Sequence, residues 1–217
     1  MGPIRFLFDY VSPYAYLAST QIRALAARHL RAVEAVPVLF AGMLDATGAR
    51  GPAEIPAKKH YMHRDVDRLA RSLGVPVEPP ATHPFNPLVA LRATGCLEEG
   101  EARWRFVDAV YRAAWVEGAR VDDAGTVERL AAGAGLDGEA LVQLASSAEA
   151  KARLREATAA AIAAGVFGVP TFLVDSELFW GVDSLALLDA YLRGAEAPDP
   201  ARIARWKAVV PSAVRKG

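Results

Sequence analysis

IRFLFDYVSPYAYL, at residues 4–17, joins a short apolar run to the start of a helical pattern. The run at 4–10 is rich in aromatic and aliphatic side chains, which is typical of a buried strand. Ser12 and Pro13 follow at once, and a serine N-cap with proline at the first helical position is a strong helix-start signal. We therefore predict a strand at 4–10 and a helix over 14–29.

The rest of the chain divides into three parts. Residues 32–40 predict a second strand, so the first 40 residues form a βαβ unit with parallel strands. From 41 to 165 the pattern is almost entirely helical and alanine-rich. Strand signals return at 171–174 and at 178–180, and a helix at 183–193 follows. Within the helical block, individual helices fit residues 57–73, 88–99, 101–117, 124–134, 138–146 and 148–164.

The order of elements is βαβ, a helical block, then ββα, and it predicts an α/β protein with a thioredoxin fold. A large all-helical insertion between strands 2 and 3 is the layout of the DsbA-like lineage. We expect residues 1–40 and 166–217 to form the thioredoxin-like domain and residues 41–165 to form an inserted helical domain.

Composition excludes several classes of function. Lys and Arg number 25, as do Asp and Glu, so the net charge is zero and a nucleic-acid partner is not expected. The single cysteine, Cys96, excludes an intramolecular disulfide and a thiolate-rich metal site, and it fits a reducing compartment. No apolar run is long enough to span a membrane or to act as a secretory signal, so we expect a cytoplasmic protein. His60 and His63 lack a third ligand at a recognisable spacing, so no metal is expected either.

In a thioredoxin fold the redox pair Cys-x-x-Cys occupies the turn from the first strand into the first helix. Here that turn is Ser12-Pro13-Tyr14-Ala15, so dithiol–disulfide exchange is impossible. The N–H groups and dipole of a helix N-terminus still favour a thiolate, and Ser12 could donate a hydrogen bond to a sulfur supplied from outside. The same residues are also what an ordinary helix start requires, and taken alone they favour capping.

Four segments together resemble one family. Residues 8–17, 52–58, 167–172 and 178–183 resemble, in order and spacing, segments of the 2-hydroxychromene-2-carboxylate isomerases and their relatives, the kappa-class glutathione transferases. The likeness runs from about residue 4 to 193. It implies that Ser12 contacts the thiol of bound glutathione.

The resemblance also implies how glutathione is held. It assigns cofactor-binding roles to Lys58, Asp65, Val169, Pro170, Asp183 and Ser184. Pro170 is expected to follow a cis bond, so that the backbone of Val169 can pair with the cysteinyl part of glutathione. Asp183, also a candidate N-cap of the last helix, is expected to meet the glutamyl amine. Ala49 replaces the family's usual asparagine and Ser184 its usual arginine, so we expect weaker glutathione binding than in relatives.

The activity implied is the glutathione-dependent interconversion of 2-hydroxychromene-2-carboxylate and trans-o-hydroxybenzylidenepyruvate, a step in aromatic hydrocarbon breakdown. The partner implied is a small aromatic carboxylate, and the assembly is a homodimer. Two alternatives remain open: a kappa-like transferase that conjugates glutathione to electrophiles, and a non-catalytic thioredoxin-fold binding protein. Conjugation by a transferase consumes free thiol, whereas isomerisation leaves its concentration unchanged.

Overall fold

The chain builds a four-stranded mixed sheet with the strand order β2-β1-β3-β4. β1 (Ile4–Phe8) runs parallel to β2 (Val33–Pro37) and antiparallel to β3 (Thr171–Val174), which pairs with β4 (Glu177–Trp180) in antiparallel register. This computed structural model describes residues 2–195 and 199–213. The sheet order and the helical insertion confirm the predicted thioredoxin fold.

Helices join and cover the strands. α1 (Pro13–Arg28) connects β1 to β2. The insertion between β2 and β3 consists of α2 (Phe40–Thr47), η1 (Pro52–Glu54), α3 (Pro56–Leu73), α4 (Leu88–Cys96), α5 (Glu101–Trp115), α6 (Ala124–Gly133), α7 (Gly138–Ala145) and α8 (Ala148–Ala163). After β4 come η2 (Val182–Ser184), α9 (Leu185–Leu192) and α10 (Pro200–Lys207).

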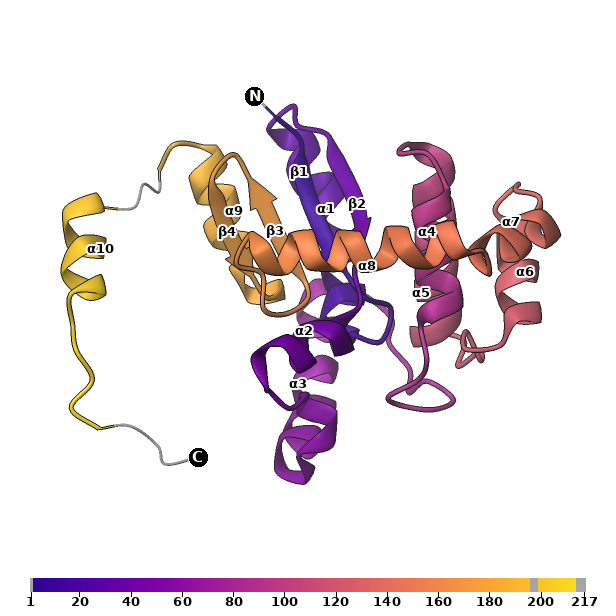
Figure 1. The fold of residues 1–217 in the computed structure, drawn as a ribbon, viewed down its shortest axis with the longest axis horizontal. Coiled ribbons are helices and arrows are strands. Elements are labelled where there is room, and N and C mark those ends of the chain that lie inside the picture. The colour runs from indigo at the N-terminus through magenta and orange to yellow at the C-terminus, as the bar shows by residue number, and fades with distance from the viewer. Residues whose placement is uncertain (1, 196–198, 214–217) are drawn as a thin grey trace.

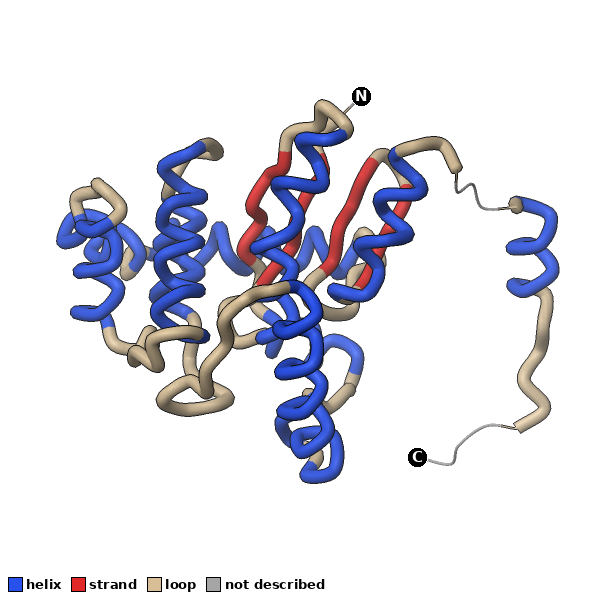
Figure 2. The backbone as a smooth tube through the Cα atoms, turned by 180° about the vertical axis from the view of Figure 1, so that it is seen from behind, coloured by secondary structure: helices blue, strands red, loops and turns tan. Residues whose placement is uncertain are grey.

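Alternate side chains of β1 enter two different cores, as the pleat of a strand requires. Phe6 stacks on Phe8 and Phe172 at centroid distances of 5.3 and 5.6 Å, within the core on the α1 side of the sheet. Leu7 faces the other way and packs with a group that includes Ala161 of α8. Figures 1 and 2 show the resulting layers, with α8 across one face of the sheet and α1 and α9 against the other. β1 thus lies buried between two helical layers, and the loop from β1 to α1 begins at this buried strand.

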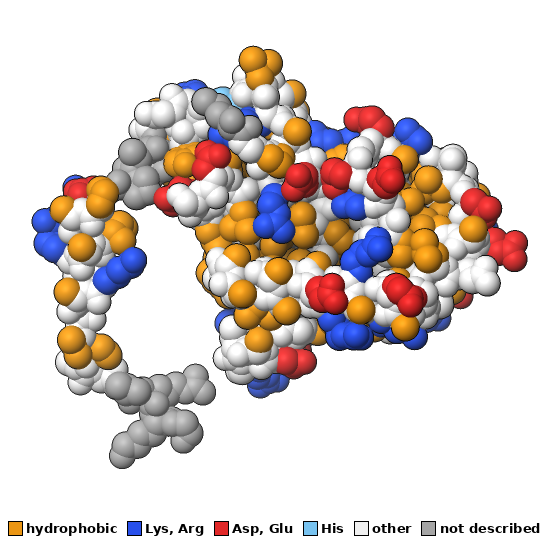
Figure 3. Space-filling model, turned by 45° about the horizontal axis from the view of Figure 1, so that its top comes forward, with side chains coloured by type: hydrophobic (Ala, Val, Ile, Leu, Met, Phe, Trp, Pro, Cys, Tyr) orange, Lys and Arg blue, Asp and Glu red, His pale blue; other side chains and the backbone are white. Residues whose placement is uncertain are grey.

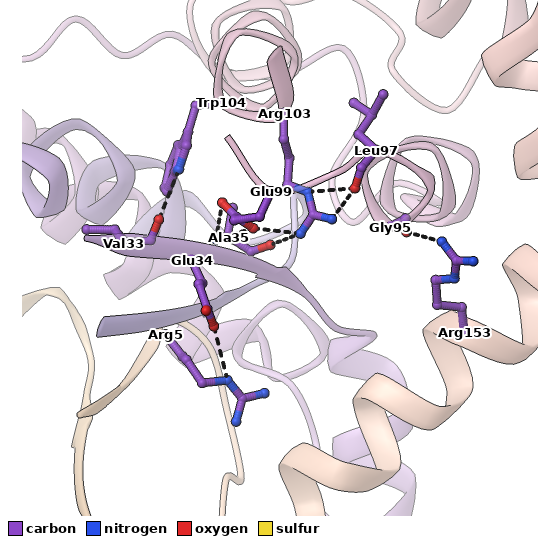
Figure 4. A network of polar contacts seen from close by, with 10 residues as sticks. All are labelled: Arg5, Val33, Glu34, Ala35, Gly95, Leu97, Glu99, Arg103, Trp104 and Arg153. Carbon is purple, nitrogen blue, oxygen red and sulfur yellow. Dashed lines mark hydrogen bonds and ion pairs between the residues drawn. The ribbon is translucent and has the colours of Figure 1, made fainter. Parts of the chain in front are cut away.

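The edge strand β2 is closed by side chains from the insertion (Figure 4). The backbone N–H of Ala35 donates to the carboxylate of Glu99 at 3.2 Å, and Arg103 Nη1 donates to the Ala35 carbonyl at 3.0 Å. Trp104 Nε1 donates to the Val33 carbonyl at 3.3 Å. Unpaired edge groups would otherwise invite pairing with another chain, so these contacts both protect the edge and fix the insertion to the sheet.

The predicted helical insertion shares its core with the sheet. The ring of Trp104, in α5, lies 6.1 Å from that of Phe6 in β1, and both belong to one continuous hydrophobic cluster. The division into residues 1–40 and 166–217 on one side and 41–165 on the other stays a prediction. Residues 1, 196–198 and 214–217 of that division lie outside the described part of the chain.

Several predicted boundaries were wrong, and the first strand ends at Phe8 rather than at residue 10. The second strand ends at Pro37 rather than at residue 40, because Phe40 already begins α2. Asp183 is not the N-cap of the last helix: it lies inside the 3-10 turn η2, and α9 begins two residues later, at Leu185. α10 was not predicted at all. In residues 2–195 and 199–213, no helix is long and apolar enough to cross a membrane.

Candidate active site

Ser12 lies at the point where β1 gives way to α1. Its Oγ accepts a hydrogen bond from the backbone N–H of Ala15 at 3.2 Å, which makes Ser12 the N-cap of α1, with Pro13 at the first helical position. The residue is 8% exposed. The capping prediction is therefore confirmed, and it does not compete with a binding role, because a hydroxyl that accepts one hydrogen bond can still donate another.

The proton of the Ser12 hydroxyl points across the site to the loop before β3. Ser12 Oγ donates to the carbonyl oxygen of Val169 over a long 3.5 Å, and the Val169–Pro170 peptide bond is cis. In the described part of the chain the N–H of Val169 finds no acceptor. A cis bond was expected only from the family resemblance, and that expectation is confirmed. The long contact and the unpaired amide leave hydrogen-bonding capacity for a ligand at this point.

Tyr14 connects α1 to the insertion through a shared carboxylate. Its hydroxyl donates to Asp65 Oδ2 at 2.9 Å, and the hydroxyl of Tyr61 donates to Asp65 Oδ1 at 3.3 Å. Partial burial, then the hydrogen bond to Asp65 and its charge, hold the pKa of Tyr14 well above its ordinary value, and the charge of Asp183 adds to this. Asp65 is thus used to orient two tyrosines that face the site.

Lys58 borders a pocket beside this tyrosine pair. The pocket has a volume of about 360 Å³, and Tyr14, Pro52 and Tyr61 also line it. Lys58 is exposed, and its ammonium group pairs with no carboxylate in the described residues. A free cation beside a mostly apolar pocket suits the carboxylate of a peptide-like ligand.

Asp183 lies on η2, which packs against α1 as α3 does. Its side chain is exposed and folds back over Gly181, where an added Cβ would lie only 2.3 Å from Asp183 Oδ1. Gly181 also has φ of 91°, so a glycine is needed there for two reasons. Ser184 Oγ and the Ser184 N–H both donate to the Gly181 carbonyl, at 2.7 and 3.2 Å. Ser184 therefore holds the turn that presents Asp183.

Two exposed aromatic rings flank the cis-proline loop. Phe167 and Trp180 are 48% and 52% exposed, and their ring centroids lie 5.0 Å apart. Between them in the chain, Gly168 allows the indole to lie over the loop, since a Cβ there would be 2.7 Å from Trp180 Nε1. Exposed, paired aromatics beside a polar site are suited to an aromatic ligand.

Asp9 is a fully buried carboxyl group three residues before Ser12. It accepts hydrogen bonds from the N–H groups of Val11 at 3.1 Å and Phe40 at 2.9 Å. Burial raises the pKa of Asp9 to about 7, although these two bonds favour the carboxylate. Its own carbonyl accepts from the Ser12 N–H at 3.1 Å, so Asp9 sets the path of the chain into the site.

His83 and Trp115 support the same loop from behind. Trp115 Nε1 donates to the Tyr10 carbonyl at 2.9 Å, and His83 Nε2 lies 3.0 Å from the Val11 carbonyl oxygen. The two rings meet edge to face at 5.5 Å. Burial lowers the pKa of His83, so the ring is neutral at pH 7 and Nε2–H is the donor to Val11.

The predicted residues thus come from four elements, α1, α3, the cis-proline loop and η2, and they lie near the first turn of α1: Val169 contacts Ser12, and the α3 residues lie beside Tyr14. The sequence did not point to the bond from Tyr14 to Asp65, to the Phe167–Trp180 pair, or to the burial of Asp9. The aspartate immediately after an apolar strand was the only available signal for the last of these. Within residues 2–195 and 199–213, no cluster of three His, Cys, Asp or Glu side chains could hold a metal ion.

A family model of the DsbA-like thioredoxin domain matches residues 3–193. The chain belongs to this family. It is 34% identical over 193 residues to the 2-hydroxychromene-2-carboxylate isomerase of Sphingobium xenophagum, an alignment that covers 87% of this chain and 97% of that protein. It is 26% identical over 221 residues to glutathione S-transferase kappa 1 of Rattus norvegicus, with 92% and 96% covered.

A solved structure of 2-hydroxychromene-2-carboxylate isomerase superposes with a TM-score of 0.80 at 28% identity, covering 94% of this chain and 97% of that one. These relatives confirm the resemblance drawn from the four sequence segments. These three relatives, at 26–34% identity, are named as isomerases or as a kappa-class transferase.

Proposed function

We propose that this DsbA-like chain is a glutathione-dependent isomerase that interconverts 2-hydroxychromene-2-carboxylate and trans-o-hydroxybenzylidenepyruvate. The observation that carries the proposal is Ser12, a buried hydroxyl at the N-terminus of α1 in a family whose oxidoreductases have a cysteine there. The 34% identity with an isomerase of this name, over 97% of its length, supports the reaction.

The residues around Ser12 fit glutathione. The tripeptide has one amine, two carboxylates and a thiol, so its site needs charges of both signs placed apart. Lys58 on α3 supplies a free cation and Asp183 on η2 a free carboxylate, on elements that both flank α1. The unpaired N–H of Val169 and its weakly bonded carbonyl match the backbone of the cysteinyl residue.

When bound beside Ser12, glutathione would supply a thiolate nucleophile for reversible addition to the conjugated double bond of the substrate. Ser12 stabilises the thiolate by turning its O–H from the Val169 carbonyl to the sulfur. Pro13 has no N–H and the Ala15 N–H is bonded to Ser12 Oγ, so the Tyr14 N–H and the positive end of the helix dipole are what α1 adds. Partial burial, and then the hydrogen bond to Asp65, keep Tyr14 protonated, and Asp65 orients the Tyr14 side chain beside the site.

The substrate proposed is a small aromatic carboxylate. Phe167 and Trp180 offer it a stacking surface next to the cis-proline loop. Lys58 is assigned to glutathione, and we propose that Asp65 and Ser184 act on the cofactor indirectly, through Tyr14 and through the Gly181 turn. The same proposal includes a cytoplasmic location and a homodimer, and light scattering after gel filtration would test the dimer.

The decisive experiment follows two quantities in one reaction with glutathione. Absorbance of the open-chain form reports isomerisation, and titration with a thiol reagent reports free glutathione. We expect isomerisation that requires glutathione and leaves the thiol concentration unchanged. Conjugation to a model electrophile with equal loss of thiol, and no isomerisation, would instead establish the kappa-like transferase that the 26% identical relative suggests. Binding of glutathione with neither reaction would indicate a binding protein.

A further inference from the structure

A second pocket lies between α2, α4 and α8, away from the elements that build the Ser12 site. Its volume is about 380 Å³, and apolar side chains, including Leu39, Leu88 and Leu154, form much of its lining. Three cationic side chains, Arg92, Lys151 and Arg155, also line it. None of its lining residues belongs to the pocket beside Lys58.

The three cations lack partners. In the described residues no carboxylate forms an ion pair with Arg92, Lys151 or Arg155, and their side-chain N–H groups form no hydrogen bond. Arg92 Nε is buried without any hydrogen bond, the single such side-chain atom in residues 2–195 and 199–213. Burying an N–H without an acceptor is costly, so the Nε–H of Arg92, a residue that lines the pocket, is an unsatisfied donor that a ligand could pair.

A neighbouring cation, Arg153, does have a hydrogen-bond acceptor within the chain. Arg153, on α8 between Lys151 and Arg155, donates to the Gly95 carbonyl at 3.0 Å and is therefore satisfied within the chain (Figure 4). In the space-filling view, Lys and Arg side chains lie among apolar side chains across the body of the molecule (Figure 3). The pocket combines both properties, because cationic and apolar side chains line it together.

We propose that this pocket is a binding site for a small organic carboxylate with an apolar body. The planar fork of a guanidinium matches a carboxylate, and Arg92 and Arg155 provide two of them. Lys151 adds a point charge, and the leucine side chains cover the apolar part of the ligand. The proposal does not depend on the reaction at Ser12.

The test is calorimetric titration of the full chain with 1-naphthoate and with its uncharged analogue, 1-naphthylmethanol. We expect the carboxylate to bind and the alcohol to bind at least tenfold more weakly, because only the anion satisfies the arginines. Arg155→Met and Arg92→Met should each weaken naphthoate binding by about tenfold. Arg129→Met, which removes an exposed cation on α6, is the matched control and should leave binding unchanged.

A second kind of variant blocks the pocket by volume and leaves its charges in place, and its melting temperature shows whether it folds. A Cβ at Gly42 would point toward Thr158 Cγ2 at 3.4 Å, so Gly42→Leu fills the pocket while adding a good helix former to α2. We expect this variant to melt no lower than wild type and to lose naphthoate binding. The proposal is overturned if naphthoate does not bind, if the alcohol binds equally well, or if Gly42→Leu and Arg155→Met bind like wild type. It is also overturned if Trp180→Ala, in the Ser12 site, is the variant that abolishes binding.

Discussion

The hydroxyl of Ser12 lies 3.5 Å from the carbonyl oxygen of Val169, although 157 positions separate the two residues in the sequence. One caps α1 and the other precedes the cis peptide bond to Pro170. The sheet brings them together because β1 and β3 are adjacent strands. A donor at a helix N-terminus therefore faces a backbone segment that can bind a peptide, and this pairing is the centre of the proposed glutathione site.

Ser12→Ala should lower turnover by about a hundredfold, the loss expected when one positioned donor to a developing charge is removed. The fold should survive, with a capping loss of about 1 kcal/mol. Steady-state kinetics and a thermal melt measure the two effects. Ser19→Ala is the matched control, because Ser19 is a buried serine of the same helix whose hydroxyl donates to the Tyr16 carbonyl. Turnover close to that of wild type in Ser12→Ala would exclude Ser12 from catalysis.

The Ser12→Cys variant tests whether the N-terminus of α1 stabilises a thiolate at this position. The N-terminus of α1 should lower the pKa of the new thiol and make it react rapidly with iodoacetamide near neutral pH. Cys96 is the internal reference, because burial raises its pKa and slows its alkylation. Equal alkylation rates for the two thiols would show that α1 does not stabilise a thiolate at this position.

Removal of either charge that flanks α1 should weaken glutathione binding. For Lys58→Met and Asp183→Asn we expect losses of about 1–3 kcal/mol, the range of a hydrogen bond to a charged group. The Lys58→Met effect should shrink as salt rises, because Lys58 is exposed. Titration with glutathione measures this, and Arg68→Met, on the same helix, serves as control. Dissociation constants identical to that of wild type would remove both residues from the site.

The architecture was predictable because its signals are local. The apolar run at β1, the Ser12-Pro13 helix start and the return of strand patterning at β3 each lie within a few residues. α2 was partly hidden because Phe40 continues the apolar pattern of the preceding strand. α10 was missed although Asp199 caps it and Pro200 occupies its first turn, the same kind of signal as Ser12-Pro13.

The site was less predictable because its geometry depends on contacts between distant segments. Lys58 and Asp65 were correctly expected on one helix, but periodicity could not show that Asp65 would be bound by Tyr14, 51 residues away. Asp183 was misassigned as an N-cap because the 3-10 turn after Gly181 displaces the start of α9. The burial of Asp9 depends on α2 packing over the end of β1, which no local pattern encodes.

Asp9 should make the stability of the fold depend on pH. Its folded pKa of about 7 is above the ordinary value of 3.8, so the folded protein binds more protons than the unfolded chain between these values. The free energy of unfolding should therefore fall as pH rises from about 4 to about 7, by up to about 4 kcal/mol.

Asp9→Asn should abolish this slope. Its absolute stability should also drop, since Val11 and Phe40 donate to different oxygens of Asp9 and an amide replaces one of these oxygens by an NH2 group. Urea denaturation at several pH values measures the slope, and Asp45→Asn, an exposed aspartate, should keep that of wild type. Parallel curves for Asp9→Asn and wild type would contradict the assignment.

Trp180→Ala should raise the KM for the aromatic substrate several-fold, because a stacked aromatic pair contributes about 0.5–1.5 kcal/mol. Turnover at saturation should change little, since Trp180 contacts the cis-proline loop and Phe167 rather than Ser12. Trp180→Phe should recover most of the affinity, which separates stacking from a general disturbance of the loop. Trp206→Ala, which removes an indole that is 69% exposed on α10, is the matched control and should leave KM unchanged. If Trp180→Ala and Trp206→Ala both give the wild-type KM, the substrate binds elsewhere than on this aromatic pair.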